Sequence, residues 1–198
     1  SHLTRHVLRE ACTAAVSLQA AGRPLSMAVN ISATLLHERA IVRMVREVLA
    51  ETGLDAGTLT LEITETYRIS NLERAGEVVR ELAGLGVKIS MDDFGVGAAS
   101  LEALLQLPFG ELKIDRLFID RITYDSKAAG IVRSVLQLGR DLRITVVAEG
   151  AEDRATLLML RDLGCPVAQG YGLSRPISIE DISEFQADGG AQGLTGMV

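Results

Sequence analysis

The sequence has few of the residues that would place it among disulfide-rich or redox-active proteins. It contains two cysteines, Cys12 and Cys165, which are far apart and belong to no CxxC pair. This spacing predicts two ordinary buried thiols, one packed in a helix and one in a loop, and no disulfide framework.

Long apolar runs and an excess of basic residues are also absent. No run of apolar residues approaches the roughly 18 that a membrane-spanning helix needs, and the first residues do not resemble a signal peptide. We therefore expect a cytoplasmic domain with no direct membrane insertion. The formal net charge is −6, which disfavours a polynucleotide partner, because proteins that neutralise phosphates are rich in Lys and Arg. A small anionic ligand is still compatible with this charge, because one local cation can outweigh it.

What the sequence does contain is enough apolar material for one folded domain. The chain has 198 residues, of which 47% are hydrophobic and 23% charged, and these values are typical of a globular domain with its own core. We expect the domain to cover residues 1–188. Residues 189–198 have too little apolar content to pack and are expected to form a flexible tail.

Hydrophobic periodicity and turn residues predict alternating strands and helices. Strands are expected at 25–31, 58–64, 87–91, 111–115, 144–149 and 166–171, and helices at 3–20, 35–52, 70–83, 100–107, 126–140, 152–163 and 179–186. This alternation implies parallel strands joined by helical crossovers. Two α/β architectures satisfy it: an open doubly wound sheet, and a (β/α)8 barrel of the TIM type with about six of its eight units present.

Polar residues at the strand ends favour the barrel. Every expected strand carries at least one at or near its carboxyl end: Asn30, Glu62, Asp92 with Asp93, Lys113, Glu149 and Gln169. In a barrel all strand ends meet at one mouth, where the active site forms. In an open sheet ligands bind only at the switch point, so the outer strands would not need acids. We therefore expect a barrel whose N-terminal units are absent, since complete barrels need ~250 residues.

Several carboxylates at one mouth repel one another unless cations neutralise them. Oxygen ligands with no nearby Cys or His select Mg²⁺, Mn²⁺ or Ca²⁺ over zinc. Such a site could hold two ions ~3.5–4 Å apart, bridged by Asp92. Lys113 could stabilise charge on a phosphate or orient a water molecule. Glu149 could hold or deprotonate that water, or bind the second metal. The alternative is a purely structural network of ion pairs, which would be costly to bury.

The sequence resembles the EAL family of cyclic-di-GMP phosphodiesterases. The matching stretches are AVNIS (28–32), LEITE (61–65), MDDFGVGAASL (91–101), LKIDR (112–116), VVAEGAE (146–152) and GCPVAQGYGLSRP (164–176). The resemblance implies a (β/α)8 barrel that hydrolyses cyclic-di-GMP to linear pGpG with Mg²⁺ or Mn²⁺, as a homodimer, with a sensor or cyclase domain upstream.

The resemblance also implies roles for individual residues. Asn30, Glu62 and Asp92 look like metal ligands with Asp92 bridging, and Asp93 looks like a ligand of the second metal. Lys113 and Glu149 are similar to the catalytic pair that acts on the water. Glu65 resembles the acid that anchors the glycine loop at 93–100, while Glu152 and Gln169 are similar to positions that line the substrate site.

Two departures from the family pattern leave a second function open. The loop reads GVGAAS where the family more often has GTGYSS. The Glu-Ala-Leu signature would precede Ser1, so the chain is predicted to lack it and the metal ligand that it carries, either as a piece of a longer enzyme or as a naturally shortened protein. The alternative to an active phosphodiesterase is therefore a cyclic-di-GMP sensor or protein-interaction module without catalysis. A phosphoacceptor receiver domain fits less well, because its sheet is five-stranded and its acids come earlier in the chain.

Overall fold

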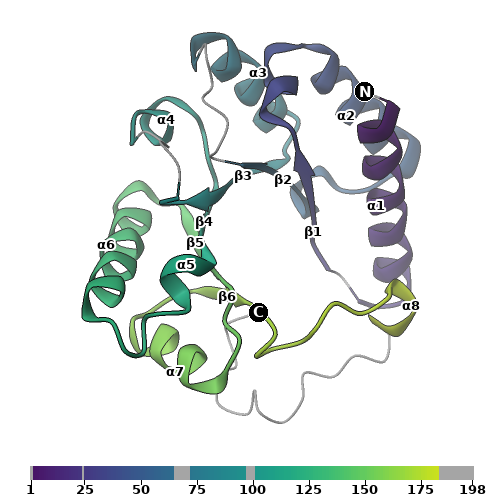
Figure 1. Ribbon diagram of the computed structural model, residues 1–198. Helices are drawn as coiled ribbons and strands as arrows, with labels where there is room; N and C mark the ends of the chain where they lie inside the picture. Colours follow the sequence, from purple (N-terminus) through teal and green to yellow (C-terminus); the bar gives the residue numbers. More distant parts are fainter. Residues whose placement is uncertain (1, 24, 65–71, 97–100, 183–198) are drawn as a thin grey trace. The chain divides into compact units, whose positions relative to one another are not determined.

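A computed structural model gives the structure of the chain and describes residues 2–23, 25–64, 72–96 and 101–182 (Figure 1). The strands are β1 (Met27–Ile31), β2 (Leu59–Thr64), β3 (Lys88–Phe94), β4 (Glu111–Ile114), β5 (Thr145–Glu149) and β6 (Val167–Gln169). The α-helices are α1 (His2–Ala20), α2 (Ala40–Thr52), α3 (Leu72–Gly84), α4 (Leu101–Gln106), α5 (Arg116–Ile119), α6 (Ser126–Leu142), α7 (Arg154–Asp162) and α8 (Ile179–Ile182). Two short 3₁₀ helices, η1 (Ala33–His37) and η2 (Ala56–Thr58), complete the described elements.

Within the described residues the strands follow one another in the sheet in chain order, from β1 to β6. The pairs β1–β2, β4–β5 and β5–β6 are parallel, as the strand–helix alternation predicts. An open doubly wound sheet reverses its strand order at a switch point. The sequential order shows no such reversal, which agrees with the barrel and not with its competitor.

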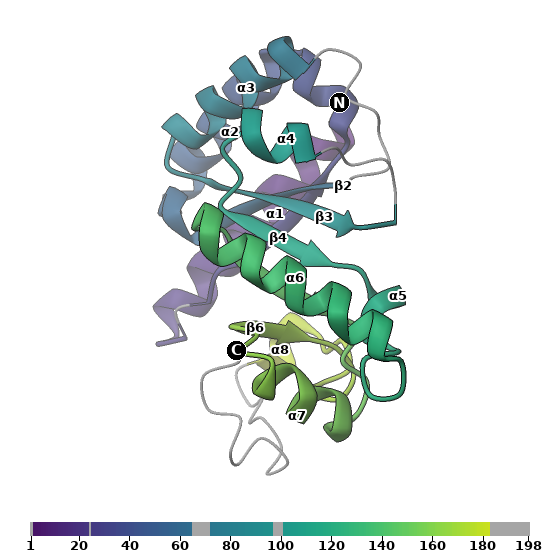
Figure 2. The same cartoon turned by 90° about the vertical axis from the view of Figure 1, so that its left-hand side faces the viewer.

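The chain divides into two compact units, and the division falls within β3. Unit 1 contains residues 1–91 and 98–109, and unit 2 contains residues 92–97 and 110–198. In unit 1, α1 packs against β1 and α2. In unit 2, α6 packs against β4 and β5, and Figure 2 shows α6 beside β4.

Each long helix buries one stripe of apolar side chains, as its periodicity predicts. The stripe of α1 consists of Leu8, Cys12, Ala15 and Leu18, and that of α2 of Ile41, Val42, Val45 and Val48. Burial in the stripe of α1 raises the pKa of the Cys12 thiol. Cys165 is also buried, and neither cysteine forms a disulfide, in agreement with the prediction of two ordinary packed thiols.

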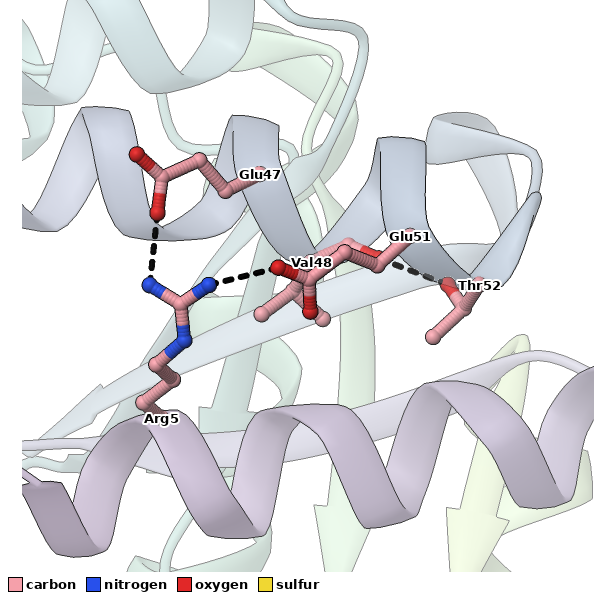
Figure 3. Close-up of polar contacts among 5 residues, drawn as sticks. All are labelled: Arg5, Glu47, Val48, Glu51 and Thr52. Carbon is pink, nitrogen blue, oxygen red and sulfur yellow. Dashed lines mark hydrogen bonds and ion pairs between the residues drawn. The ribbon is translucent and has the colours of Figure 1, made fainter.

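The solvent-facing sides of α1 and α2 are joined by ion pairs (Figure 3). The Arg5 guanidinium donates to the carboxylates of Glu47 at 2.5 Å and Glu51 at 2.6 Å. All three side chains remain more than one third exposed to solvent. Among the described residues, no helix combines the length and the apolar character that crossing a membrane requires.

Three local differences separate the structure from the sequence-based elements. The strand expected to end at residue 91 continues to Phe94, so the paired acids lie within β3. The helix expected from residue 35 begins at Ala40, because Ser32 accepts a hydrogen bond from the Thr34 amide and starts the 3₁₀ helix η1 instead. The sequence also gave no indication of α5, a single turn whose N-cap Asp115 accepts from the Leu117 amide at 2.7 Å.

Candidate active site

In unit 1 two predicted site residues lie opposite each other near the ends of parallel strands. Asn30 of β1 is the register partner of Glu62 of β2, and partners on adjacent strands present their side chains to the same face. Glu62 is only 7% exposed, whereas Asn30 is exposed. Unit 1 therefore places one buried carboxylate and one amide oxygen together, as the strand ends predict.

In unit 2 the carboxylates of Asp92 and Asp93 come from neighbouring positions, which in a regular strand would point to opposite faces. Asp93 has a left-handed backbone with φ 58°, which interrupts this alternation. The Asp93 amide donates to Asp92 Oδ1 at 3.1 Å. The turn is closed by Gly95, with φ 100°, and by the Val96 amide, which donates to the Asp93 carbonyl at 3.3 Å. Aspartate is one of the few residues that tolerate the left-handed region.

The Lys113 ammonium group lies between the carboxylates of Asp92 and Glu149. Its side chain is 7% exposed, and Nζ lies 2.5 Å from Glu149 Oε1 and 3.4 Å from Asp92 Oδ1. The register explains this contact. Lys113 is paired with Val147, and Glu149, two residues further along β5, projects from the same face. The ammonium group therefore neutralises part of the charge that the buried carboxylates would otherwise concentrate.

Gln169 completes this network from the neighbouring strand. It is the register partner of Glu149, and its Nε2 donates to Glu149 Oε1 at 2.5 Å. One carboxylate oxygen thus accepts from both a lysine and an amide, which fixes the orientation of the Glu149 carboxylate. Gln169 contacts Glu149 directly.

The acids of unit 2 can also hold a cation. Among the described residues, Asp92, Asp93 and Glu149 each offer a carboxylate oxygen, and these atoms lie within 4.8 Å of one another. This donor set consists of hard oxygen ligands, which suits Mg²⁺, Mn²⁺ or Ca²⁺ and not a thiolate-seeking metal. The residues present therefore fit a divalent cation, in agreement with the expectation from the sequence.

The remaining predicted site residues have different positions. Glu152 lies in the loop after β5, and its carboxylate is 2.8 Å from the Arg116 guanidinium. It is not part of the cluster formed by Asp92, Asp93 and Glu149. Glu65 lies outside the described residues, as do positions 97–100 of the glycine loop, so the anchoring role expected for Glu65 stays a prediction.

Sequence reasoning assigned no role to Arg116 or Gly150, although both lie in the motifs LKIDR and VVAEGAE. The stem of Arg116 runs under Gly150, where a Cβ would lie 2.5 Å from Arg116 Cγ. The pKa of Arg116 is raised, because Asp120 hydrogen-bonds and attracts the guanidinium and Glu152 adds its charge. The glycine directly after Glu149 was the only signal in the sequence, because glycine often marks a close approach of the backbone to another group.

Comparison with known proteins places this arrangement in a family. The model of the EAL domain matches residues 1–176. The chain is 39% identical over 180 residues to cyclic di-GMP phosphodiesterase NbdA of Pseudomonas aeruginosa, a match covering 90% of this chain and 23% of NbdA. The chain spans about a quarter of the length of the curated relatives it matches.

Two solved structures are similar along nearly the whole chain. The PaMucR phosphodiesterase in complex with c-di-GMP has a TM-score of 0.85 and 38% identity, covering 91% of this chain and 74% of that one. The EAL domain of Mycobacterium smegmatis DcpA has a TM-score of 0.88 and 33% identity, covering 99% of this chain and 86% of that one. These similarities confirm the expected α/β fold of the TIM-barrel type.

The prediction that the chain lacks the family's signature is not borne out. The family model matches from residue 1 onward. The signature therefore gives no reason to regard the protein as inactive.

Proposed function

The chain belongs to the EAL domain family, and we propose that it hydrolyses cyclic-di-GMP to linear pGpG with the aid of Mg²⁺ or Mn²⁺. The observation that carries the proposal is the convergence of the Asp92, Asp93 and Glu149 carboxylate oxygens within 4.8 Å of one another, with the buried Lys113 in contact with two of them. The names of NbdA and of PaMucR, which describe phosphodiesterases of cyclic di-GMP, support the choice of substrate.

The proposed mechanism assigns the metal to the acids of unit 2. A bound divalent ion lowers the pKa of a water molecule and polarises the phosphoryl oxygens. Asp92 and Asp93 would hold the metal through their carboxylate oxygens, with Asp92 as the shared ligand that the family resemblance implies. Asn30 and Glu62 belong to unit 1; we assign them to metal binding from the family resemblance, and their oxygen atoms are of the type such ions prefer.

Lys113 and Glu149 act on the water and the phosphate. Glu149 accepts a proton as the water oxygen forms its bond to phosphorus, and the bond from phosphorus to the 3′ oxygen breaks. The leaving oxygen takes a proton from solvent, so that one water is consumed for each linear dinucleotide formed. Lys113 stabilises the negative charge that develops on the phosphoryl oxygens. Gln169 keeps the Glu149 carboxylate oriented through its amide.

Further parts of the proposal concern the setting of the site. We assign Glu152 and Gln169 to the substrate side of the site and Glu65 to the anchoring of the glycine loop. The protein would act in the cytoplasm, next to a sensor or cyclase domain, as a homodimer. Leu101 and Leu105 of α4 are 60% and 76% exposed, one helical turn apart, and offer an apolar strip to a second copy.

The test is hydrolysis of cyclic-di-GMP by this chain and by the full-length protein that carries it. Each is incubated with cyclic-di-GMP and either Mg²⁺ or Mn²⁺, and pGpG is followed by chromatography. We expect product with the metal, none with a chelator, and a large loss with Asp92→Asn. Glu111→Gln is the matched control, because Glu111 begins β4, at the end of the strand away from Lys113. Absence of product from folded full-length protein with either ion would overturn the proposal.

Binding of cyclic-di-GMP without hydrolysis is the second candidate function. It is favoured by the glycine loop, where Val96 is 55% exposed at a position that is more often polar in the family. An exposed valine offers no hydrogen bond to order the loop or its ligand. Titration calorimetry separates the two functions, since heat of nucleotide binding with no pGpG formed supports a sensor.

A further inference from the structure

The short helix α5 lies directly after the strand that carries Lys113 and contacts the two segments that follow the site's acids. Asp115 caps the helix by accepting from the Leu117 amide, so its first turn is fixed to the end of β4. From this turn Phe118 reaches the segment after Asp93, and Arg116 reaches the segment after Glu149. All of these residues belong to unit 2.

The contact of Phe118 is with the backbone of Gly95. A Cβ built on Gly95 would lie 2.7 Å from Phe118 Cε2 and 3.1 Å from Cζ, so the ring lies directly against this glycine. Gly95 follows Asp93 by two residues and has φ 100°, while Asp93 has φ 58°. Glycine adopts a positive φ readily, whereas for Asp93 the left-handed region is sparsely populated, and such a conformation persists only where the surroundings hold it.

Arg116 makes the second contact of α5. Its stem fills the space in front of Gly150, which has φ 77° and follows Glu149 directly. Two carboxylates hold its guanidinium: Nε lies 2.9 Å from Asp120 Oδ2, and Nη2 lies 2.8 Å from Glu152 Oε1. One helical turn therefore packs against both acid-bearing segments of unit 2.

We propose that Phe118 is a positioning residue that holds the turn from Asp93 to Gly95, so that the Asp92 and Asp93 carboxylates stay together for a divalent cation. The proposal rests on the metal site of the proposed function. Without the ring, the turn relaxes toward commoner backbone conformations and the carboxylate of Asp93 moves away from Asp92 and Glu149. Arg116 acts in the same way, and more weakly, on the segment that follows Glu149.

The experiment measures Mn²⁺ binding directly, with no nucleotide present. Calorimetry and electron paramagnetic resonance give the Mn²⁺ affinity of the wild-type chain, Phe118→Ala, Phe118→Tyr and the control Leu117→Ala. Leu117 neighbours Phe118 on α5 and is 46% exposed. We expect a loss of about 10- to 100-fold in affinity for Phe118→Ala, the range seen when residues that orient metal ligands are changed. Phe118→Tyr, which keeps the ring, and Leu117→Ala should stay close to wild type.

Gly95→Ala tests the same contact from the other side. The added methyl group must displace the Phe118 ring, and the left-handed backbone disfavours alanine. The affinity for Mn²⁺ should therefore fall even if Phe118→Ala does not fold, which thermal unfolding establishes separately. In hydrolysis assays, excess Mn²⁺ should restore much of the lost rate in both variants, because the reacting groups are unchanged.

Three outcomes overturn the inference. The inference fails if folded Phe118→Ala or Gly95→Ala binds Mn²⁺ as tightly as wild type. It also fails if Leu117→Ala loses as much affinity as Phe118→Ala, which would indicate general loosening of α5. If the wild-type chain binds no Mn²⁺, the proposed metal site fails and this inference fails with it. If the wild type binds Mn²⁺ normally but forms no pGpG, only the proposed reaction fails.

Discussion

Two regions of the molecule contain the same arrangement, one cation between two carboxylates. On the surface of unit 1, Arg5 contacts Glu47 and Glu51 at 2.5 and 2.6 Å. At the strand ends of unit 2, Lys113 contacts Glu149 and Asp92 at 2.5 and 3.4 Å. The Arg5 side chain is 39% exposed and that of Lys113 is 7% exposed. Distance alone therefore does not distinguish the two arrangements, whereas burial does.

This difference in burial determines how much each cation contributes to stability. Around Arg5, water and salt screen the charges, so the pairs stabilise little. The pKa of Arg5 is raised because Glu47 and Glu51 hydrogen-bond the guanidinium, but arginine is charged at physiological pH in any case. Around Lys113 the carboxylates are shielded from water, and loss of the cation leaves them uncompensated. Only the buried arrangement concentrates charge in the way that the proposed metal binding and phosphoryl transfer require.

The largest effect is expected from Lys113→Met, which breaks the buried arrangement. Without metal, the free energy of unfolding should fall by about 3–5 kcal/mol, because a buried and a half-buried carboxylate lose their cation. Mn²⁺ should recover part of this loss by neutralising the same acids. Chemical denaturation with and without Mn²⁺ measures both effects. The control is Lys88→Met, which removes an exposed lysine of β3. An equal loss of unfolding free energy in both variants would show that burial does not distinguish the two lysines.

Glu149→Gln should abolish most hydrolysis while keeping the fold. It removes the proposed proton acceptor, a change that costs about 10²- to 10⁴-fold in rate, whereas the amide can still contact Gln169. Steady-state kinetics at saturating Mn²⁺ measure the loss, and the melting temperature monitors the fold. A variant with more than one tenth of the wild-type rate would show that Glu149 is not the proton acceptor.

Asp153→Ala tests an exposed carboxylate that acts through the backbone. Asp153 caps α7 and accepts from the Thr156 amide at 2.7 Å, which lowers its pKa from 3.8. Loss of such a cap costs about 1 kcal/mol of unfolding free energy. Because the folded-state pKa is the lower one, this stabilisation is fully present above pH 3.8 and is lost as the pH falls through the folded-state pKa.

Denaturation of Asp153→Ala and wild type between pH 7 and pH 2.5 measures this dependence. The difference in unfolding free energy should be constant near neutrality and should narrow below pH 3.8. Asp125→Ala, which removes the cap of α6, gives a second value for a cap in the same unit. If the difference in unfolding free energy between the two proteins grew on acidification, ionised Asp153 would not be the group that stabilises α7.

The smallest effect is expected from Arg5→Ala. The Arg5 pairs are exposed and close only the outer edge between α1 and α2 (Figure 3). The melting temperature at physiological salt should be close to that of wild type, with a small decrease at low salt where screening is weak. Hydrolysis should be unchanged. A decrease as large as that of Lys113→Met would show that burial does not explain the difference between the two regions.

Much of the site followed from the sequence, because strand ends are easy to locate and acids at them are unusual. The alternation of β-branched and polar residues in TLTLEIT located Glu62, and the motif LKIDR located Lys113 at the end of a strand. The end of β3 was placed too early, because the left-handed backbone of Asp93 carries no signal in hydrophobic periodicity. The turn α5 was missed for a related reason, since four residues are too few for helical periodicity to be read.

The sequence by itself determined the order of the strands, the parallel pairing and the residue types available at each strand end. These features depend on local pattern and on the length of the crossovers. Only the tertiary structure decided which groups touch: that Glu149 accepts from both Lys113 and Gln169, that Glu152 pairs with Arg116, and that Phe118 lies against Gly95. The physical reason is that register, burial and close approach are set between segments distant in the chain, which no local pattern encodes.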